Sequence, residues 1–313
     1  MSGEATVAQI ASLLVGLRVK GETADEVAGA AGALRGAMVH LPAERPEELV
    51  DTCGTGGGAI GTFNISTAAA LLAAGAGVRV AKHGNRSFTS QCGSADVLEA
   101  LGVPIEVPVP VMARALRDAG IVFMFAPLMH PAMRHVGPVR RELGIPTVMN
   151  IVGPLANPAG AGRQVVGVAD ARRVPLIAGA LLSLGTTHAL VVHGEPGMDE
   201  ISPLGPTQVI EIRDGRATEW AIDPSDYGMT NGRADELAGG SPADNATTVR
   251  AVLAGDAPPT ARAAVLLNAA AAVYVSVGGV RSFGDAVDVA RAALDRGAGL
   301  AALERLRVAF AAS

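Results

Sequence analysis

Residues 51–67 read Asp51-Thr-Cys-Gly-Thr-Gly-Gly-Gly-Ala-Ile-Gly-Thr-Phe-Asn-Ile-Ser-Thr67, and this stretch indicates the class of fold. A short strand is expected just before it, five glycines fall within residues 54–61, and a helical pattern begins at about Ser66. Glycine permits positive φ angles and lets a ligand approach the backbone closely. The start of the following helix offers unpaired N–H groups and the positive end of its dipole. The stretch therefore predicts a phosphate-binding loop, with a flexible connection as the alternative.

Strands and helices alternate along most of the chain. This alternation predicts an α/β fold with a mainly parallel central sheet covered by helices. The segments 208–212 and 218–222 flank Asp214-Gly215, which indicates an antiparallel hairpin at the edge of that sheet. The other strands are expected at 50–53, 78–81, 121–125 and 189–192.

The first 40 residues predict two helices. Thr6 with Gln9, and Thr23 with Glu26, fit the capping box, in which side chains satisfy free backbone donors of the first helical turn. A linker containing two prolines then leads into the α/β pattern. Later helices are expected at 94–101 (with Ser94 as the cap), 133–143, 243–254, 260–277, 283–296 and 300–311.

The composition excludes several classes of protein. The chain has 313 residues, of which 49% are hydrophobic, and a formal net charge of −5, which argues against nucleic-acid binding. Its most apolar stretch, 263–280, is interrupted by polar residues and predicts a buried helix, not a membrane span. Cys53 and Cys92 cannot form a disulfide framework, and the first residues do not resemble a signal peptide. We therefore expect a cytoplasmic protein that binds neither membranes nor nucleic acids.

A second polar motif, Lys82-His-Gly-Asn-Arg-Ser-Phe-Thr-Ser90, follows the strand expected at 78–81. Ligands of open α/β sheets bind beyond the carboxyl ends of the strands. We therefore expect this motif and the glycine loop to face one ligand, with Lys82 and Arg86 as local cations. A solvated polar loop is the alternative interpretation.

A dinucleotide site fits these residues less well. Gly56-x-Gly58-x-x-Gly61 matches the dinucleotide fingerprint, which also needs an acidic residue about 20 positions later to bind the ribose. No Asp or Glu lies between Asp51 and Asp96. A nicotinamide cofactor is therefore disfavoured, and the absence of Gly-Lys-Ser/Thr after the glycines also excludes a Walker loop.

The third motif, His193-Gly-Glu-Pro-Gly-Met-Asp199-Glu200, again follows an expected strand. Adjacent carboxylates suit Mg²⁺, which prefers oxygen ligands and keeps waters or substrate phosphates in its shell. Most Asp–Glu pairs are simply solvated, and it is the expected phosphate loops nearby that favour a metal here.

The fourth motif runs from His130 to Arg141 and contains two adjacent arginines in an expected helix. The guanidinium group of an Arg such as Arg140 can bind a carboxylate through two parallel hydrogen bonds. By itself the pattern favours a surface Arg on an amphipathic helix.

Seven motifs occur together in a fixed order: Gly54-Thr-Gly-Gly57, Thr62-Phe-Asn-Ile-Ser-Thr67, Lys82-His-Gly-Asn-Arg-Ser87, Gly93-Ser-Ala-Asp-Val-Leu-Glu-Ala-Leu-Gly102, His130-Pro-Ala-Met-Arg-His135, Gly153-Pro-Leu-Ala-Asn-Pro158 and Gly197-Met-Asp-Glu200. In these motifs the chain resembles anthranilate phosphoribosyltransferase, the family that joins anthranilate to phosphoribosyl pyrophosphate (PRPP) in tryptophan biosynthesis. The resemblance extends over nearly the whole chain.

The resemblance implies a set of binding residues. Mg²⁺ would be held by Ser66, Asp199 and Glu200. Anthranilate would contact Gly54, Asn85, His130 and Arg140. No general acid or base is implied. PRPP would be held by Gly54, Gly57, Gly58, Thr62, Asn64, Ile65, Ser66, Thr67, Lys82, His83, Gly84, Asn85, Ser90 and Ser94.

The resemblance also implies two domains and a homodimer. Residues 1–45 and 130–155 would form a small helical domain, and residues 46–129 and 156–313 would form the PRPP-binding α/β domain. The stretch 146–152, whose composition fits a strand or a short helix, is then expected to be helical.

Several positions depart from the family pattern: Gln91 and Cys92 replace a usual polar-basic pair, Ala156 stands where Thr is usual, and Gly58 stands where Asp is usual. The missing carboxylate should reduce repulsion of the pyrophosphate and remove an indirect metal contact.

Three other functions remain open: a transferase for another aromatic acid, a pyrimidine nucleoside phosphorylase of the same architecture, and a non-enzymatic relative that binds nucleic acid.

Overall fold

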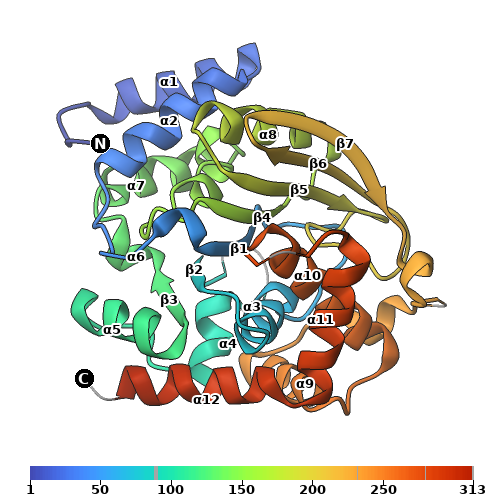
Figure 1. The fold of residues 1–313 in the computed structure, drawn as a ribbon. Coiled ribbons are helices and arrows are strands. Elements are labelled where there is room, and N and C mark those ends of the chain that lie inside the picture. The colour runs from blue at the N-terminus through green and yellow to red at the C-terminus, as the bar shows by residue number, and fades with distance from the viewer. Residues whose placement is uncertain (88–90, 231, 279, 312–313) are drawn as a thin grey trace.

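The computed structural model describes residues 1–87, 91–230, 232–278 and 280–311 (Figure 1). Within these residues the strands form one seven-stranded sheet in the order β3-β2-β1-β4-β5-β6-β7. The first five strands in chain order pair in parallel, and the last two are antiparallel. The predicted α/β class with a mainly parallel sheet is thus confirmed. The strands are β1 (Val50–Gly54), β2 (Val80–Gly84), β3 (Ile121–Phe125), β4 (Arg163–Gly167), β5 (His188–Gly194), β6 (Thr207–Arg213) and β7 (Arg216–Ile222).

The predicted edge hairpin is confirmed, since β6 and β7 meet at Asp214-Gly215 and β7 forms one edge of the sheet. The strand β2 starts at Val80, two residues later than predicted. Lys82, His83 and Gly84 form its end, because the register with β3 continues to its last residue. The strand β4 was not predicted: its sequence, Arg-Gln-Val-Val-Gly, is short, and its pairing with β1 and β5 joins segments far apart in the chain.

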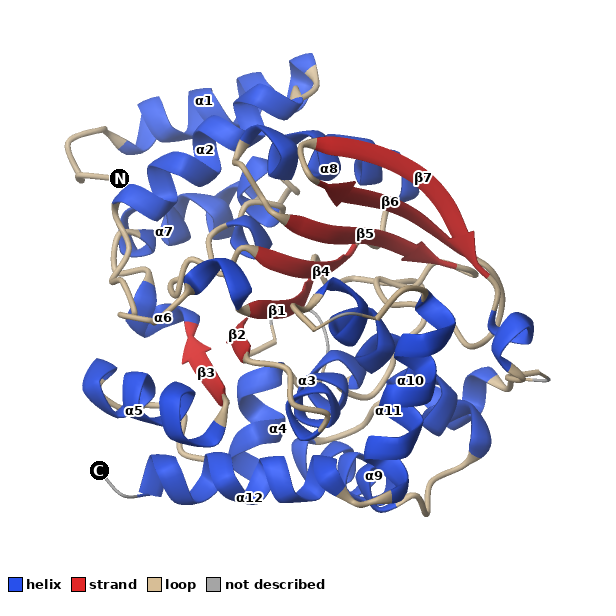
Figure 2. Cartoon of the chain, in the orientation of Figure 1, coloured by secondary structure: helices blue, strands red, loops and turns tan. Residues whose placement is uncertain are grey.

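Helices cover both faces of the sheet (Figure 2). On one face α3 packs against β1, and α10 packs against β4 and α3; on the other, α8 packs against β5 and β6. The predicted N-terminal and C-terminal helices are confirmed, whereas α5 and α8 were not predicted. The helices are α1 (Val7–Lys20), α2 (Ala24–Gly36), α3 (Ile65–Gly75), α4 (Ser94–Ala100), α5 (Val109–Ala119), α6 (Ala126–Met129), α7 (Met133–Leu143), α8 (Val174–Ser183), α9 (Pro242–Ala254), α10 (Pro259–Val275), α11 (Phe283–Asp295) and α12 (Ala298–Ala311).

Helix ends follow local chemistry. Both N-terminal capping boxes form: the Thr6 hydroxyl accepts from Gln9 N–H, and the Thr23 hydroxyl accepts from Glu26 N–H, each at 3.3 Å. The predicted cap of α4 is wrong, because Gly93 is the cap position and Ser94 is the first helical residue. The stretch 146–152 forms only a 3₁₀ turn at Val148–Asn150, followed by another at Gly153–Leu155.

The interior has two apolar clusters, one on each side of the sheet. The larger gathers α3, α4, α5, α9, α10, α11 and α12 and is rich in alanine, which allows the close helix packing that the composition indicates. The smaller joins α2 and α8 to residues 148–156 and to β4, β5 and β6. Leu14 of α1 is buried in it, whereas Leu13, which the helical spacing of apolar residues grouped with Leu14, is 63% exposed. In the described part of the chain, no helix is long and apolar enough to cross a membrane.

Candidate active site

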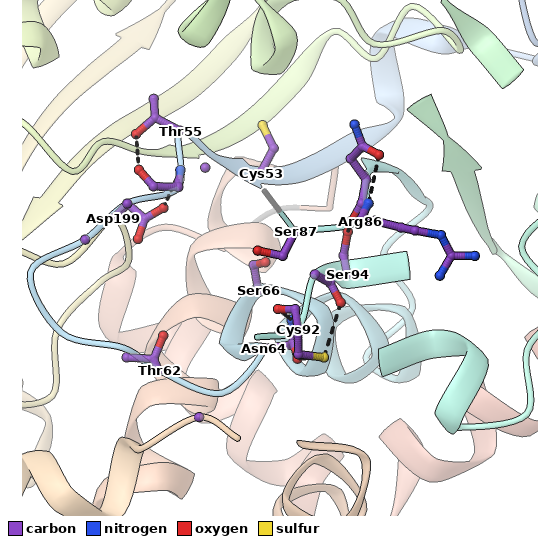
Figure 3. Close-up of a pocket in the computed structure, with 18 of the residues that line it drawn as sticks. Cys53, Thr55, Thr62, Asn64, Ser66, Arg86, Ser87, Cys92, Ser94 and Asp199 are labelled. Atoms are coloured by element: carbon purple, nitrogen blue, oxygen red, sulfur yellow. Dashed lines mark hydrogen bonds between the residues drawn. The ribbon is translucent and has the colours of Figure 1, made fainter. Parts of the chain in front are cut away.

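A pocket of about 830 Å³ opens at the carboxyl ends of the parallel strands (Figure 3). The glycine loop leaves β1, Asn85 follows β2, and Asp199 and Glu200 follow β5. These ends meet because β2, β1, β4 and β5 are neighbours that run in the same direction. The volume suits a ligand of the size of a substituted nucleotide.

The first half of the glycine loop is held against the Asp199 loop. The Gly56 N–H donates to Asp199 Oδ2 at 2.8 Å, and the Ala59 N–H donates to the Gly197 carbonyl at 2.8 Å. Gly56 has a φ of +70°, which favours glycine. A Cβ atom at Gly54 would lie only 2.8 Å from Asp199 Oδ2. The glycines therefore permit close contact between the glycine loop and the loop that carries Asp199, and they expose backbone N–H groups.

Lys82 is a buried cation at the floor of the pocket, 4% exposed. Its ammonium group donates to the Thr52 carbonyl and lies 3.3 Å from Ser66 Oγ. Burial lowers the pKa of Lys82, and the charges of Asp51 and Glu200 oppose that shift. Lys82 therefore supplies positive charge where the acidic groups of the floor lie close together.

Burial raises the pKa values of the pocket's carboxyl groups. The pKa of Glu200 rises to about 8, because the group is desolvated and lies near Asp199. Burial also raises the pKa of Asp199, although the hydrogen bond from the Gly56 N–H acts in the opposite direction and lowers it. An arriving cation would stabilise both ionised groups, so the donor set of Asp199, Glu200 and Ser66 Oγ fits Mg²⁺ that keeps waters or phosphate oxygens as its other ligands. The described residues contain no group of three or more His, Cys, Asp or Glu side chains with metal-site geometry.

Two of the polar residues expected in the site, Arg86 and His83, do not present a positive charge to a ligand there. Arg86 lines the pocket, but its guanidinium is paired with Asp96 (2.8 Å) and Glu99 (2.5 Å) and points away from the site (Figure 3). Burial lowers the pKa of His83 to about 3, so this ring is neutral at pH 7. Arg86 therefore orders the end of β2, and His83 contributes no positive charge.

Most residues expected to bind ligands do come together in this pocket. Ile65 and Thr67 are instead buried beneath it, in the first turn of α3. His130 does not line it: the ring lies behind His83, with ring centres 4.9 Å apart. Ser90 lies outside the described residues. The expected residues that line the pocket are Gly54, Gly57, Gly58, Thr62, Asn64, Ser66, Lys82, His83, Gly84, Asn85, Ser94, Arg140, Asp199 and Glu200.

Arg140 of α7 lines the pocket together with the glycine loop. It is half-buried, its pKa is lowered by burial, and it has no ion-pair partner among the described residues. This position makes it a free bidentate donor for an anionic ligand, in place of the surface Arg that the sequence alone favoured.

Sequence reasoning missed part of the wall. Gly239, Gly240 and Asn245 line the pocket although they lie far along the chain, and so do Asn150 and Pro154. The pair Gly239-Gly240 before Ser241, the cap of α9, is a local sign of a helix start. Nothing in the sequence places this segment beside the glycine loop.

Comparison with known proteins identifies the family. The model of the glycosyl transferase family a/b domain matches residues 46–300, and that of the helical bundle domain of the same family matches residues 1–38. Anthranilate phosphoribosyltransferase of Chloroflexus aggregans is 52% identical over 307 residues, which cover 98% of this chain and 89% of that protein. The chain belongs to the anthranilate phosphoribosyltransferase family.

Solved structures of anthranilate phosphoribosyltransferases share the fold. The Thermus thermophilus enzyme superposes with a TM-score of 0.93 at 43% identity, covering 99% of this chain and 92% of that one. The Saccharomyces cerevisiae enzyme in complex with PRPP and Mg gives a TM-score of 0.89 at 29% identity, with coverages of 98% and 86%. The same yeast enzyme with 4-fluoroanthranilate gives 0.87 at 28% identity, with the same coverages.

Proposed function

We propose that the chain transfers the 5-phosphoribosyl group of PRPP to the amine of anthranilate, giving N-(5-phosphoribosyl)anthranilate and pyrophosphate in tryptophan biosynthesis. One observation supports this most strongly: a single pocket is lined by the glycine loop, Lys82, the Asp199–Glu200 pair and Arg140. Family membership supports the same reaction.

The pocket offers distinct groups to each end of the substrates. The loop N–H groups, the side chains of Asn64 and Ser66, and Lys82 bind the phosphates of PRPP. Asp199, Glu200 and Ser66 would hold Mg²⁺, which would supply charge neutralisation to the departing pyrophosphate. Arg140 and Asn85 bind and orient anthranilate. His130, which is buried behind His83, supports that site through the ring of His83.

The reaction needs little proton transfer. The bond from ribose C1 to pyrophosphate breaks, the leaving oxygen takes the electron pair, and C1 gains oxocarbenium character. The preorganised donors of residues 54–67 stabilise the developing negative charge. The aromatic amine of anthranilate is neutral at pH 7 and attacks C1 from the opposite face with inversion. The nitrogen then loses one proton to water or to the released pyrophosphate, so positioning replaces a general base.

The chain's organisation fits a site that closes over its substrates. Residues 1–45 and 130–155 form a small helical domain, and residues 46–129 and 156–313 form the PRPP-binding domain. The boundary between the two family models, at residues 38 to 46, supports the first division, and the packing of α1 against α7 supports grouping residues 130–155 with the N-terminal helices. Movement near Gly153-Pro154 would exclude water that hydrolyses the sugar. The enzyme acts in the cytoplasm as a homodimer paired through its helical domains.

One assay tests the reaction. Anthranilate fluorescence should fall only when PRPP and Mg²⁺ are both present, and Asp199→Asn should remove this turnover while Glu195→Gln, an exposed change in the same loop, retains it. Turnover of thymidine with inorganic phosphate, or of another aromatic acid in place of anthranilate, would contradict the proposal. Full activity of Asp199→Asn would contradict the metal assignment.

A further inference from the structure

The second half of the glycine loop is held by a segment much later in the chain, residues 237–245. Phe63 N–H donates to the Leu237 carbonyl at 2.9 Å, and Gly239 N–H donates to the Gly61 carbonyl at 3.1 Å. A Cβ atom at Gly239 would lie 2.5 Å from the Thr62 carbonyl oxygen, so this contact requires glycine. The segment therefore forms a wall of the pocket directly against the phosphate loop.

Asn245 is the buried polar side chain of this wall, 2% exposed and near the start of α9. Its Oδ1 accepts from Gly240 N–H at 2.8 Å, and its Nδ2 donates to Asn64 Oδ1 at 2.9 Å. Asn64 Nδ2 in turn donates to the Cys92 carbonyl at 3.2 Å. Figure 3 shows Asn64 and Cys92 side by side at the base of the pocket.

The direction of these bonds is determined at both ends. A backbone N–H can only donate and a backbone carbonyl can only accept. Gly240 therefore orients Asn245 with its NH₂ group toward Asn64, and Asn64 must present its oxygen to Asn245. The Cys92 carbonyl requires the same orientation of Asn64. Both amide orientations thus follow from the bonding pattern.

We propose that Asn245 is a positioning residue for the phosphate site. By occupying Asn64 Oδ1, it keeps the NH₂ group of Asn64 on the side of Cys92, and one N–H of that group remains available to a phosphate oxygen of PRPP. A reversed Asn64 amide would present a carbonyl oxygen to the polyanion and lose that hydrogen bond. This inference rests on the proposed function, because it assigns a phosphate to the pocket beside Asn64.

The variant Asn245→Asp tests the direction of the bonds. Its carboxylate still accepts from Gly240 N–H but cannot donate to Asn64, so the Asn64 amide is driven to reverse. We expect the KM for PRPP to rise about tenfold or more, while kcat and the KM for anthranilate stay within about twofold. Because position 245 is buried, the pKa of the introduced carboxyl group should be raised. Lowering the pH toward about 5 then increases the protonated fraction, which can donate through its O–H, so the defect should shrink.

Asn245→Ala separates positioning from packing. It removes the donor without adding an acceptor, and Cys92 still orients Asn64, so its effect on the KM for PRPP should be smaller and independent of pH. Thr247→Asp adds the same charge to an exposed position of α9 and should leave the KM unchanged. Equal, pH-independent defects in both Asn245 variants, or an unchanged KM in Asn245→Asp, would overturn the proposal.

Binding of inorganic pyrophosphate with Mg²⁺, measured by calorimetry, gives a readout that needs no turnover. Weaker binding to Asn245→Asp than to the unmodified chain supports the positioning role even if anthranilate is not the acceptor. Equal binding to both overturns it. Loss of anthranilate turnover in the unmodified chain bears only on the proposed function.

Discussion

The ammonium nitrogen of Lys82 lies 3.3 Å from the hydroxyl oxygen of Ser66. Lys82 belongs to β2, and Ser66 lies in the first turn of α3, which follows the glycine loop. The contact joins the two polar motifs that the sequence presents separately. The contact also places the buried positive charge of Lys82 at the start of α3. The positive end of the helix dipole lies there too, so the two positive charges repel unless an anion binds between them.

Loss of the Lys82 charge should weaken both the fold and PRPP binding. In Lys82→Met the buried carboxylates of Asp51 and Glu200 lose their cation, so we expect the free energy of unfolding to fall by about 3 kcal/mol or more at pH 8. The KM for PRPP should rise more than tenfold. Chemical denaturation and steady-state kinetics measure the two effects. The chain's other lysine, Lys20, is half exposed at the end of α1, and Lys20→Met should change neither quantity.

The buried carboxyl group of Asp51 should make stability depend on pH. Burial raises its pKa from 3.8 to about 6, although Lys82 and hydrogen bonds from Asn157 and His83 oppose the shift. Between these values the native state holds a proton that the unfolded chain has released. The contribution is therefore complete below pH 3.8 and is lost as the pH rises through 6, amounting to about 3 kcal/mol.

Urea unfolding of the ligand-free chain at several pH values measures this contribution. In Asp51→Asn the group no longer titrates, so the free energy of unfolding should change less steeply between pH 4 and 6 than in the unmodified chain. The comparison depends on the slope, and a uniform loss of stability in the variant does not affect it. Parallel curves would show that Asp51 does not titrate in this window.

Arg140 should govern affinity for anthranilate. Its guanidinium lines the pocket without an ion-pair partner among the described residues, whereas Arg141, the next residue of α7, is exposed and outside the pocket. Arg140→Ala should raise the KM for anthranilate about tenfold or more, because hydrogen bonds to a charged carboxylate are lost. The KM for PRPP should change by less than about twofold. Arg141→Ala is the matched control, and similar kinetics in the two variants would remove the assigned role.

Gly58 should control the response to Mg²⁺. A Cβ atom there would lie 3.1 Å from Asp199 Oδ1, so Gly58→Asp adds a carboxylate beside the one at Asp199. Without metal the like charges should lower the melting temperature. With metal, the added charge should lower the Mg²⁺ concentration that gives half-maximal activity by several-fold.

Gly61→Asp provides a control in the same loop, since a Cβ atom at Gly61 meets nothing within 4 Å. The same charge placed there should shift the Mg²⁺ response less. Identical magnesium titrations for Gly58→Asp and the unmodified chain would show that this position is silent.

Local patterns predicted the elements whose signals lie within a few residues. The glycine loop, the Asp214-Gly215 hairpin and the two capping boxes were correct, because turn geometry and helix caps are satisfied by neighbours in sequence. The strand β4 escaped prediction because its stability comes from pairing with β1 and β5 on either side. Gly93 replaced Ser94 as the cap of α4 for a tertiary reason, since the Ser94 hydroxyl instead donates to the Asn85 carbonyl at 3.2 Å.

By itself the sequence determined the α/β class, the glycine loop after the first strand and the family, because these depend on residue types in a fixed order. Only the tertiary structure decided that Arg86 is paired with Asp96 and Glu99, while Arg140 lines the pocket with no ion-pair partner in the described part of the chain. It alone brought Asn245 to Asn64, 181 residues apart. The physical reason is that a side chain's charge partners and the direction of its hydrogen bonds are set by neighbours in space, which packing chooses and local sequence does not record.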